Sequence, residues 1–153
     1  MPPLFAVCAA DPGVTALLGD GPTRLYPFDE APQKGARPYA VYQVLTGVPE
    51  NYLADRPDLD SWVLQIDIYA DTGAEAIAVR DALQYAIETH AQITRIGGTG
   101  TERETKLKTT SLDVSWLVKR PVRAPEVSPY VMLIDDTGAI WTDENGNPWI
   151  EER

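Results

Sequence analysis

The chain has 153 residues, of which 44% are hydrophobic and 24% charged, and 23 acidic against 13 basic side chains give a formal net charge of −10. This length suits one globular domain, and the acidic balance argues against nucleic-acid binding, because phosphate contacts need clustered Lys and Arg. No run of about 18 apolar residues occurs, so no membrane span is expected, and the single cysteine, Cys8, cannot form an intramolecular disulfide, which fits a reducing cytoplasm.

The first part of the chain predicts two short helical segments, a loop and a strand. Residues 3–18 are interrupted at Asp11-Pro12-Gly13, where Asp11 can cap the second segment and Pro12 suits its first position. Residues 20–37 contain three prolines and predict a loop, within which residues 24–26 fit a short edge strand. Apolar residues 39–46 then predict a central strand, and the polar stretch 47–60 predicts a long loop.

The middle of the chain carries the clearest periodic patterns. Residues 61–70 include the alternating stretch LQIDIYA, which predicts a strand with Leu64, Ile66, Ile68 and Ala70 facing a core. Residues 73–90 predict an amphipathic helix in which Thr72 and Glu75 form a capping box. The apolar stripe of this helix is expected to consist of Ala74, Ile77, Ala78, Ala82, Tyr85 and Ala86, with Val79, Leu83 and Ile87 beside it.

Three further segments complete the predicted domain. Residues 92–96 predict a short strand, residues 97–100 a glycine-rich loop, and residues 106–119 a long strand. One face of the long strand would carry Leu112, Val114, Trp116 and Val118. The order of elements over residues 1–120 predicts an α+β domain with a mostly antiparallel sheet covered on one face by helices.

The last part of the chain predicts a linker followed by a small β extension. Residues 121–129 contain three prolines, which is typical of a linker. The segment 135–141 then repeats at 143–149, with an acidic pair before a turn and a Trp at the end of each copy. Asn145-Gly146 is typical of a type I′ turn. Residues 130–153 are therefore expected to form an acidic β-hairpin or meander arm.

No motif for catalysis or for binding a cofactor is present. His90 is expected at the end of a helix, where it suits the helix dipole, and Cys8 is expected to be a small core residue. The spacing of the carboxylates at 135, 136, 143 and 144 does not match an EF-hand, and turn chemistry explains them, although an irregular cation site stays open. We assign no catalytic residue, no cofactor and no metal site.

The second face of strand 61–70 carries an amide, a carboxylate and a phenol, from Gln65, Asp67 and Tyr69. No His, Cys or Lys lies beside Asp67 on this strand, so general acid–base catalysis has little support. Further apolar area on this face is expected from Tyr39 or Ala40, Tyr42, Val44 and Leu117. A mixed surface of Tyr, Gln and aliphatic residues is typical of a protein contact, and a solvated monomer surface is the alternative.

An ordered set of features between about residues 4 and 119 resembles a known family. Arg24 and Tyr26 precede a proline-containing loop, Pro38-Tyr39 opens a strand, and an alanine-rich helix follows the segment from Gln65 to Ala70. This set is similar to the tail-completion, or tail-terminator, proteins of long-tailed bacteriophages.

The resemblance implies a structural protein of the virion tail or neck that is assembled in the host cytoplasm as a hexameric ring. Such a ring caps the tail tube, stops its polymerisation and joins the tail to the head. Its partners would be the tail-tube protein and a head-completion or connector protein, and DNA would pass through its lumen without specific binding. A protein interface is then expected at Gln65, Asp67 and Tyr69. Tyr52, Leu53 and Arg56 are expected at another, because their loop has more reach and apolar content than a connection requires. Trp141 and Trp149 lie outside the family pattern, and they are expected at an interface because two or three short strands are marginal alone in water.

Three alternatives stay open from the sequence. The chain fits another ring component of the neck or tail, such as a connector or tube protein. It also fits a protein-binding adaptor of non-phage origin. A small hydrolase using carboxylates has the least support, because no base or nucleophile accompanies them.

Overall fold

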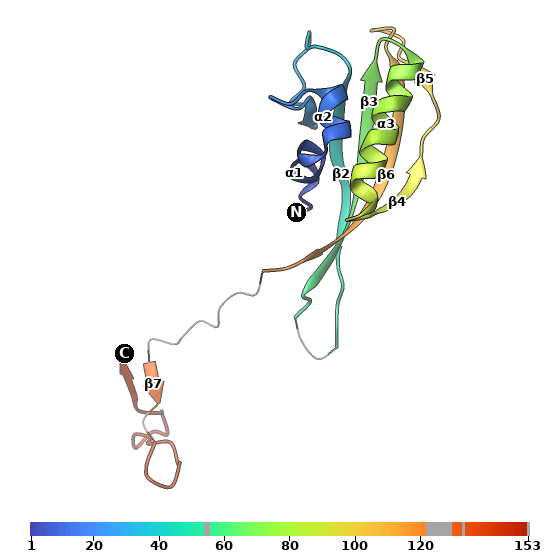
Figure 1. Ribbon diagram of the computed structural model, residues 1–153. Coiled ribbons are helices and arrows are strands. Elements are labelled where there is room, and N and C mark those ends of the chain that lie inside the picture. Colours follow the sequence, from blue (N-terminus) through green and yellow to red (C-terminus); the bar gives the residue numbers. More distant parts are fainter. Residues whose placement is uncertain (54–55, 122–129, 133, 153) are drawn as a thin grey trace. The chain divides into compact units, whose positions relative to one another are not determined.

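The computed structural model describes residues 1–53, 56–121, 130–132 and 134–152 (Figure 1). The chain divides into two compact units, Met1–Pro121 and Val122–Arg153. Most of the predicted linker, residues 122–129, lies outside the described residues.

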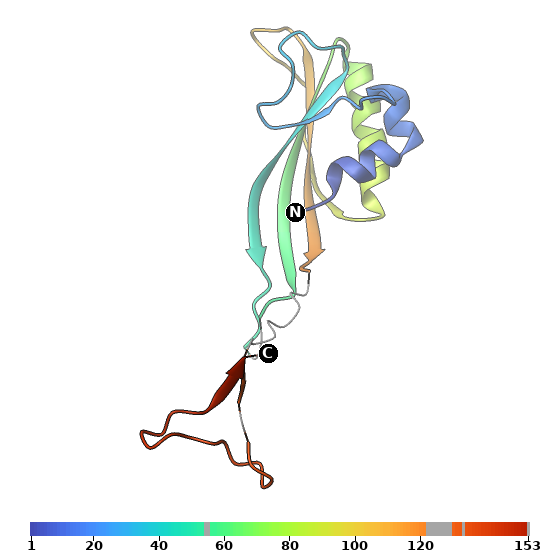
Figure 2. The same ribbon diagram turned by 90° about the vertical axis from the view of Figure 1, so that its left-hand side faces the viewer.

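The first unit is an open sheet with helices on one face (Figure 2). Its strands lie in the order β1-β2-β3-β6-β4, with β5 also paired to β6, and every pair is antiparallel except β1 with β2. This arrangement confirms the predicted α+β fold. The elements in chain order are α1 (Leu4–Ala10), α2 (Pro12–Leu18), β1 (Leu25–Pro27), β2 (Tyr39–Pro49), β3 (Leu59–Ala70), α3 (Gly73–Glu88), β4 (Gln92–Ile96), β5 (Gly100–Thr101) and β6 (Lys108–Lys119).

The predicted helix caps are present. The Asp11 carboxylate accepts hydrogen bonds from the backbone N–H groups of Gly13 and Val14, at 2.8 and 3.1 Å, and so begins α2. At the start of α3, the Glu75 N–H donates to Thr72 Oγ1 and the Thr72 N–H donates to Glu75 Oε2, both at 3.2 Å. This capping box confirms the prediction, although α3 ends at Glu88, before the predicted residue 90.

The core lies between the sheet and the helices. Leu64, Ile66, Ile68 and Ala70 of β3 are fully buried, as their alternation predicted, and Leu112, Val114 and Trp116 of β6 are buried beside them. Cys8 of α1 is a core residue, also as predicted. The sequence therefore located the core face of both long strands.

The predicted apolar stripe of α3 is partly wrong, because Ala86 is buried and Ala82 packs against the core, but the other members of the stripe are exposed. Ile77 is 37% exposed and Tyr85 is 75% exposed, whereas the buried face consists of Ala76, Val79, Leu83, Ala86 and Ile87. Val79, Leu83 and Ile87 are spaced four residues apart and bring more apolar area than the alanines of the predicted stripe. Because α3 packs against α1 and α2 as well as the sheet, the face with Val79, Leu83 and Ile87 is the one turned to the core.

Strands β2 and β3 extend into the stretch that was predicted to be a loop. Gly47, Val48 and Pro49 pair with Trp62, Ser61 and Asp60, and the β3–β6 register continues to Leu59 opposite Lys119. The prediction of a loop over 47–60 is therefore wrong at both ends, and the connection is limited to residues 50–58. We call residues 46–49, 59–63 and 115–119 the arm, where β2, β3 and β6 continue past the helices (Figures 1 and 2).

In the second unit, β7 (Tyr130–Met132) pairs with β8 (Ile150–Glu152), and two similar loops lie between them. Gly138 N–H donates to Asp135 O and Gly146 N–H donates to Asp143 O, both at 3.0 Å. Gly138 and Gly146 have φ values of 86° and 83°.

These loops correct the predicted turn type. A type I′ turn requires positive φ at both central residues, and Asn145 does not have it. Each loop is instead a type I turn followed by a left-handed glycine. Within the described residues, the middle segment of the predicted meander forms the isolated bridges Ile134–Ile140 and Thr142–Pro148 in place of a full strand.

Candidate interaction surfaces

The helix-free face of the sheet carries the predicted polar cluster. Gln65, Asp67 and Tyr69 alternate with the buried residues of β3 and are half-buried. Gln65 Nε2 donates to Asp67 Oδ1 at 2.9 Å, and Gln43 Nε2 donates to Gln65 Oε1 at 3.4 Å. The amide and the carboxylate therefore satisfy one another, which is typical of a structured surface.

Tyr69 belongs to a group of tyrosines at one end of this face. Its ring stacks on that of Tyr39 with centroids 5.0 Å apart and an interplanar angle of 15°, and Tyr26 lies 6.4 Å from Tyr39. Burial, together with the charge of Asp67, raises the pKa of Tyr69. The phenol therefore stays protonated at neutral pH and offers a donor and a flat apolar ring to a partner.

An ion pair completes the middle of the helix-free face. Arg95 Nε lies 2.6 Å from Asp113 Oδ2 and Arg95 Nη2 lies 3.2 Å from Asp113 Oδ1, which makes a bidentate pair. Asp113 stands opposite Gln65 in the register of β6 and β3. Gln43, Gln65, Asp113 and Arg95 therefore stand side by side on four neighbouring strands, β2, β3, β6 and β4.

The predicted apolar contribution of β2 to this face is partly wrong. Tyr42 and Val44 stand opposite Ile66 and Leu64, so they share the helix-covered face with Ala40. Tyr39 and Leu117 do lie on the helix-free face. The stretch YAVYQVLT is apolar on both faces, so its alternation alone could not indicate which set faces the helices.

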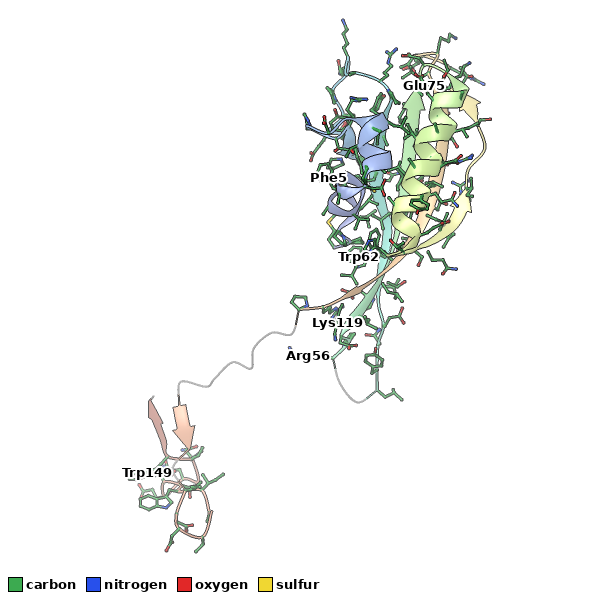
Figure 3. All side chains as sticks on the ribbon, in the orientation of Figure 1. Phe5, Arg56, Trp62, Glu75, Lys119 and Trp149 are labelled. Atoms are coloured by element: carbon green, nitrogen blue, oxygen red, sulfur yellow. The ribbon has the colours of Figure 1, made fainter. Side chains whose placement is uncertain are left out.

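The connection between β2 and β3 carries exposed side chains. Tyr52 is 51% exposed and Leu53 is fully exposed, and Arg56 is also at the surface, as labelled in Figure 3. A hydrogen bond to Asp58 raises the pKa of Tyr52. An exposed leucine beside a tyrosine at the end of a projecting arm is typical of a contact surface, and Ala54 and Asp55 lie outside the described residues.

The second unit exposes its two predicted tryptophans. Trp141 and Trp149 are each half exposed and lie edge to face, with ring centroids 6.4 Å apart. The backbone N–H of Trp149 donates a hydrogen bond to the backbone carbonyl of Trp141 at 2.7 Å (Trp149 is labelled in Figure 3). The repeat at a spacing of eight therefore places both rings together.

Two acidic residues of this unit, Asp135 and Asp143, hold its loops together. Asp135 Oδ1 accepts from the N–H groups of Thr137 and Ala139, both at 2.9 Å. Asp143 Oδ1 accepts in the same way from Asn145 and Asn147, at 2.8 and 2.9 Å. Hydrogen bonds from the Thr137 and Asn147 side chains, together with those from the backbone, lower the pKa of both carboxyl groups. Turn formation thus accounts for Asp135 and Asp143.

Sequence reasoning missed Val48, one of the apolar residues of the arm. Val48 is 52% exposed and Leu117 is 61% exposed, and they share one face because both pair with Ser61. A groove lies next to Leu117, and its other lining residues are Glu88, His90, Ala91, Gln92, Ile93 and Ser115. Val48 was missed because its neighbours Gly47 and Pro49 suggested a loop.

The described residues also bear on other kinds of site. Within them, no group of three or more His, Cys, Asp or Glu side chains is arranged to hold a metal ion. None of the helices in the described part of the chain has the length and apolar character to cross a bilayer.

The comparison with protein families identifies the chain. A model of the family described as tail completion protein gp17 matches residues 2–119. The chain belongs to this family of phage tail completion proteins. The match covers nearly all of the first unit and confirms the resemblance inferred from the sequence. The comparison with curated proteins gave no match. The second unit lies outside the matched residues, so this tail completion protein has an additional C-terminal unit whose role the family does not supply.

Proposed function

We propose that this tail completion protein assembles as a hexameric ring that caps the tail tube, stops its polymerisation and joins the tail to the head. The family match over residues 2–119 carries this proposal. The sheet supports it, because one face is covered by helices while the other exposes tyrosines, amides and the apolar residues of the arm. A surface of this composition suits contacts between proteins.

The expected interface residues are divided among three contacts. In a cyclic ring, one surface of a subunit meets a different surface of its neighbour. Gln65, Asp67 and Tyr69 are assigned to contacts within the ring. Tyr52, Leu53 and Arg56, at the end of the arm, are assigned to the tail-tube protein, and Trp141 and Trp149 to a further component such as the head-completion or connector protein.

The charge of the protein suits a channel for DNA. With a formal net charge of −10, a ring of identical subunits repels the phosphate backbone. DNA can then pass through the lumen without being held, whereas a basic lumen would retain it.

Mass measurement and microscopy test this function. Purified protein at rising concentration, and tails isolated from infected cells, are examined by light scattering and negative-stain electron microscopy. We expect a ring of six subunits, either free or at one end of the tail. Without the protein, we expect tails of uncontrolled length and unattached heads, and supplying the protein in trans should restore both. A monomer in solution that is also absent from the ends of tails contradicts the proposal.

A further inference from the structure

The arm has two outer edges that no described strand covers. Strand β1 pairs only with Ala40, Val41 and Tyr42 of β2, so the outer edge of β2 is open along the arm. On the opposite side, β4 reaches β6 only as far as Ser115, which leaves Trp116–Lys119 open. An open strand edge presents unpaired N–H and C=O groups and is a template for pairing with another chain.

The hydrogen bonds of the arm show which groups point outward. Glu50 N–H donates to Leu59 O at 3.0 Å, and Arg120 N–H donates to Asp58 O at 2.7 Å. Because inward and outward groups alternate along an antiparallel strand, Gly47 and Pro49 turn their backbone groups away from β3, and so do Leu117 and Lys119.

The two edges are therefore chemically different. Pro49 has no N–H, so the outer edge of β2 presents the carbonyls of Gly47 and Pro49 but only the N–H of Gly47. The outer edge of β6 presents N–H groups at Leu117 and Lys119. The proline disfavours pairing of β2 with a second β2 and leaves acceptors for the donors of β6.

The side chains of β2 and β6 that stand opposite the same residue of β3 are also complementary. Val48 and Leu117 both stand opposite Ser61, and each is more than half exposed on the same face of the sheet. One step further along the arm, Lys119 stands opposite Leu59, whose carbonyl accepts from Glu50. One edge thus ends in a carboxylate and the other in an ammonium group.

We infer that the β2 edge of one copy, Gly47–Pro49, pairs with the β6 edge of the next copy, Leu117–Lys119, and that this contact closes the ring. The inference rests on the proposed function. Both strands run antiparallel to β3, so they share a direction, and a rotation about an axis along the arm brings them together as a parallel pair. The groove beside Leu117 then receives the neighbouring β2, and because the two edges differ, the contact repeats around a closed ring.

Disulfide trapping tests this pairing. The variant with Val48→Cys and Leu117→Cys places one thiol on each edge. Within a chain these positions lie two strands apart, roughly 10 Å, which is beyond the reach of a disulfide. The native Cys8 does not interfere, because its burial raises the pKa of the thiol to about 12. On mild oxidation we expect a ladder of covalent oligomers ending at the ring size, which collapses on reduction.

Two controls and a replacement pair sharpen the experiment. Val48→Cys alone should give no ladder, and neither should Ser61→Cys, which places the thiol in the same row on the central strand. If the first pair fails to fold, as judged by circular dichroism, the exposed pair Glu50→Cys and Lys119→Cys replaces it.

The outcomes separate the edge pairing from the proposed function. A ladder that requires both thiols supports the pairing. Rings that assemble from a folded double variant without a ladder overturn it and leave the proposed function standing. Absence of rings from the wild-type protein, both free and on tails, overturns both.

Discussion

Trp62 and Gly47 show how single residues shape the arm. A Cβ atom added at Gly47 would lie 2.8 Å from the Trp62 ring, so only glycine leaves room for the indole. The indole Nε1 is buried without a hydrogen-bond partner in the described structure, which costs free energy that the packing of the ring must offset. The arm therefore depends on this close contact between β2 and β3.

Replacing Gly47 with Ala should destabilise the protein. The new methyl group overpacks the Trp62 ring and should lower the free energy of unfolding by about 1–3 kcal/mol. Urea denaturation monitored by tryptophan fluorescence measures this change. Gly98→Ala is the matched control, because a Cβ there meets no atom within 4 Å. Equal stability of the two variants would show that the indole moves aside without cost.

Residues with local functions were the most predictable from the sequence. Asp11, Thr72 and Glu75 cap helices through atoms no more than three residues away, so spacing alone predicted them. The orientation of Tyr42 and Val44 was predicted wrongly, because it depends on which side of the sheet the helices cover. Local hydrogen bonding can be predicted from neighbours along the chain, whereas the choice between two apolar faces needs tertiary structure.

At the scale of elements, the arm is the feature that could not be predicted from the sequence. Gly47 and Pro49 are poor strand residues, yet both lie in β2 because its partner β3 is long and continuous. Pairing between strands therefore overrides the local preference of these residues. The proposed interface residues of the connection between β2 and β3, in contrast, were chosen for an unusual apolar content that can be recognised without structural context, and their role stays a prediction.

Replacing Tyr52 and Leu53 with Ser should impair assembly but leave folding unchanged. Both side chains are exposed, so their loss removes little buried area and the unfolding midpoint should stay within error of the wild type. Phages carrying the double variant should form tails of abnormal length or fail to join heads, as scored by electron microscopy and plaque titre.

The control for this variant is Phe28→Ser. Phe28 is 68% exposed in a different loop, so this variant also removes exposed apolar surface, but from outside the connection between β2 and β3. Normal particles from Phe28→Ser and defective ones from the double variant are expected. Normal infectivity of the double variant would count against a role of this connection in assembly.

At the scale of the whole molecule, the two units differ in the interactions that stabilise their folds. The buried cluster of the first unit is built from residues between Leu4 and Trp116, with Val118 packed against it. The second unit has short paired strands and exposed tryptophans, and strands of this kind are marginally stable in isolation. The sequence predicted the α+β fold of the first unit and its family, but partners for the second unit depend on surfaces of other proteins.

Truncation after Arg123 should leave the first unit folded. Because its described core contains no residue from the second unit, we expect the melting temperature of the truncated protein to stay within a few degrees of that of the full chain. Incorporation into particles should fall, since the exposed tryptophans are lost. Calorimetry and quantitative immunoblotting of purified particles measure the two effects.

Two results would contradict this prediction. A truncated protein that does not fold would show that the second unit belongs to the core. Full incorporation would show that the unit is dispensable for assembly. The variant with Trp141→Ala and Trp149→Ala, in the full chain, distinguishes loss of the aromatic surface from loss of the unit.

The ion pair at the end of β6 has a mechanical consequence. The Arg120 guanidinium binds both oxygens of Asp60, with Nη2 at 2.6 Å from Oδ1, and the Arg120 N–H donates to Asp58 O. Tension applied to the chain beyond Pro121 therefore reaches the sheet through this clamp. Where the pull runs along β6, it loads the twelve residue pairs between β3 and β6 in shear, so that they resist together instead of opening one at a time. A pull in this direction should therefore be resisted more strongly than one that peels β6 away from β3.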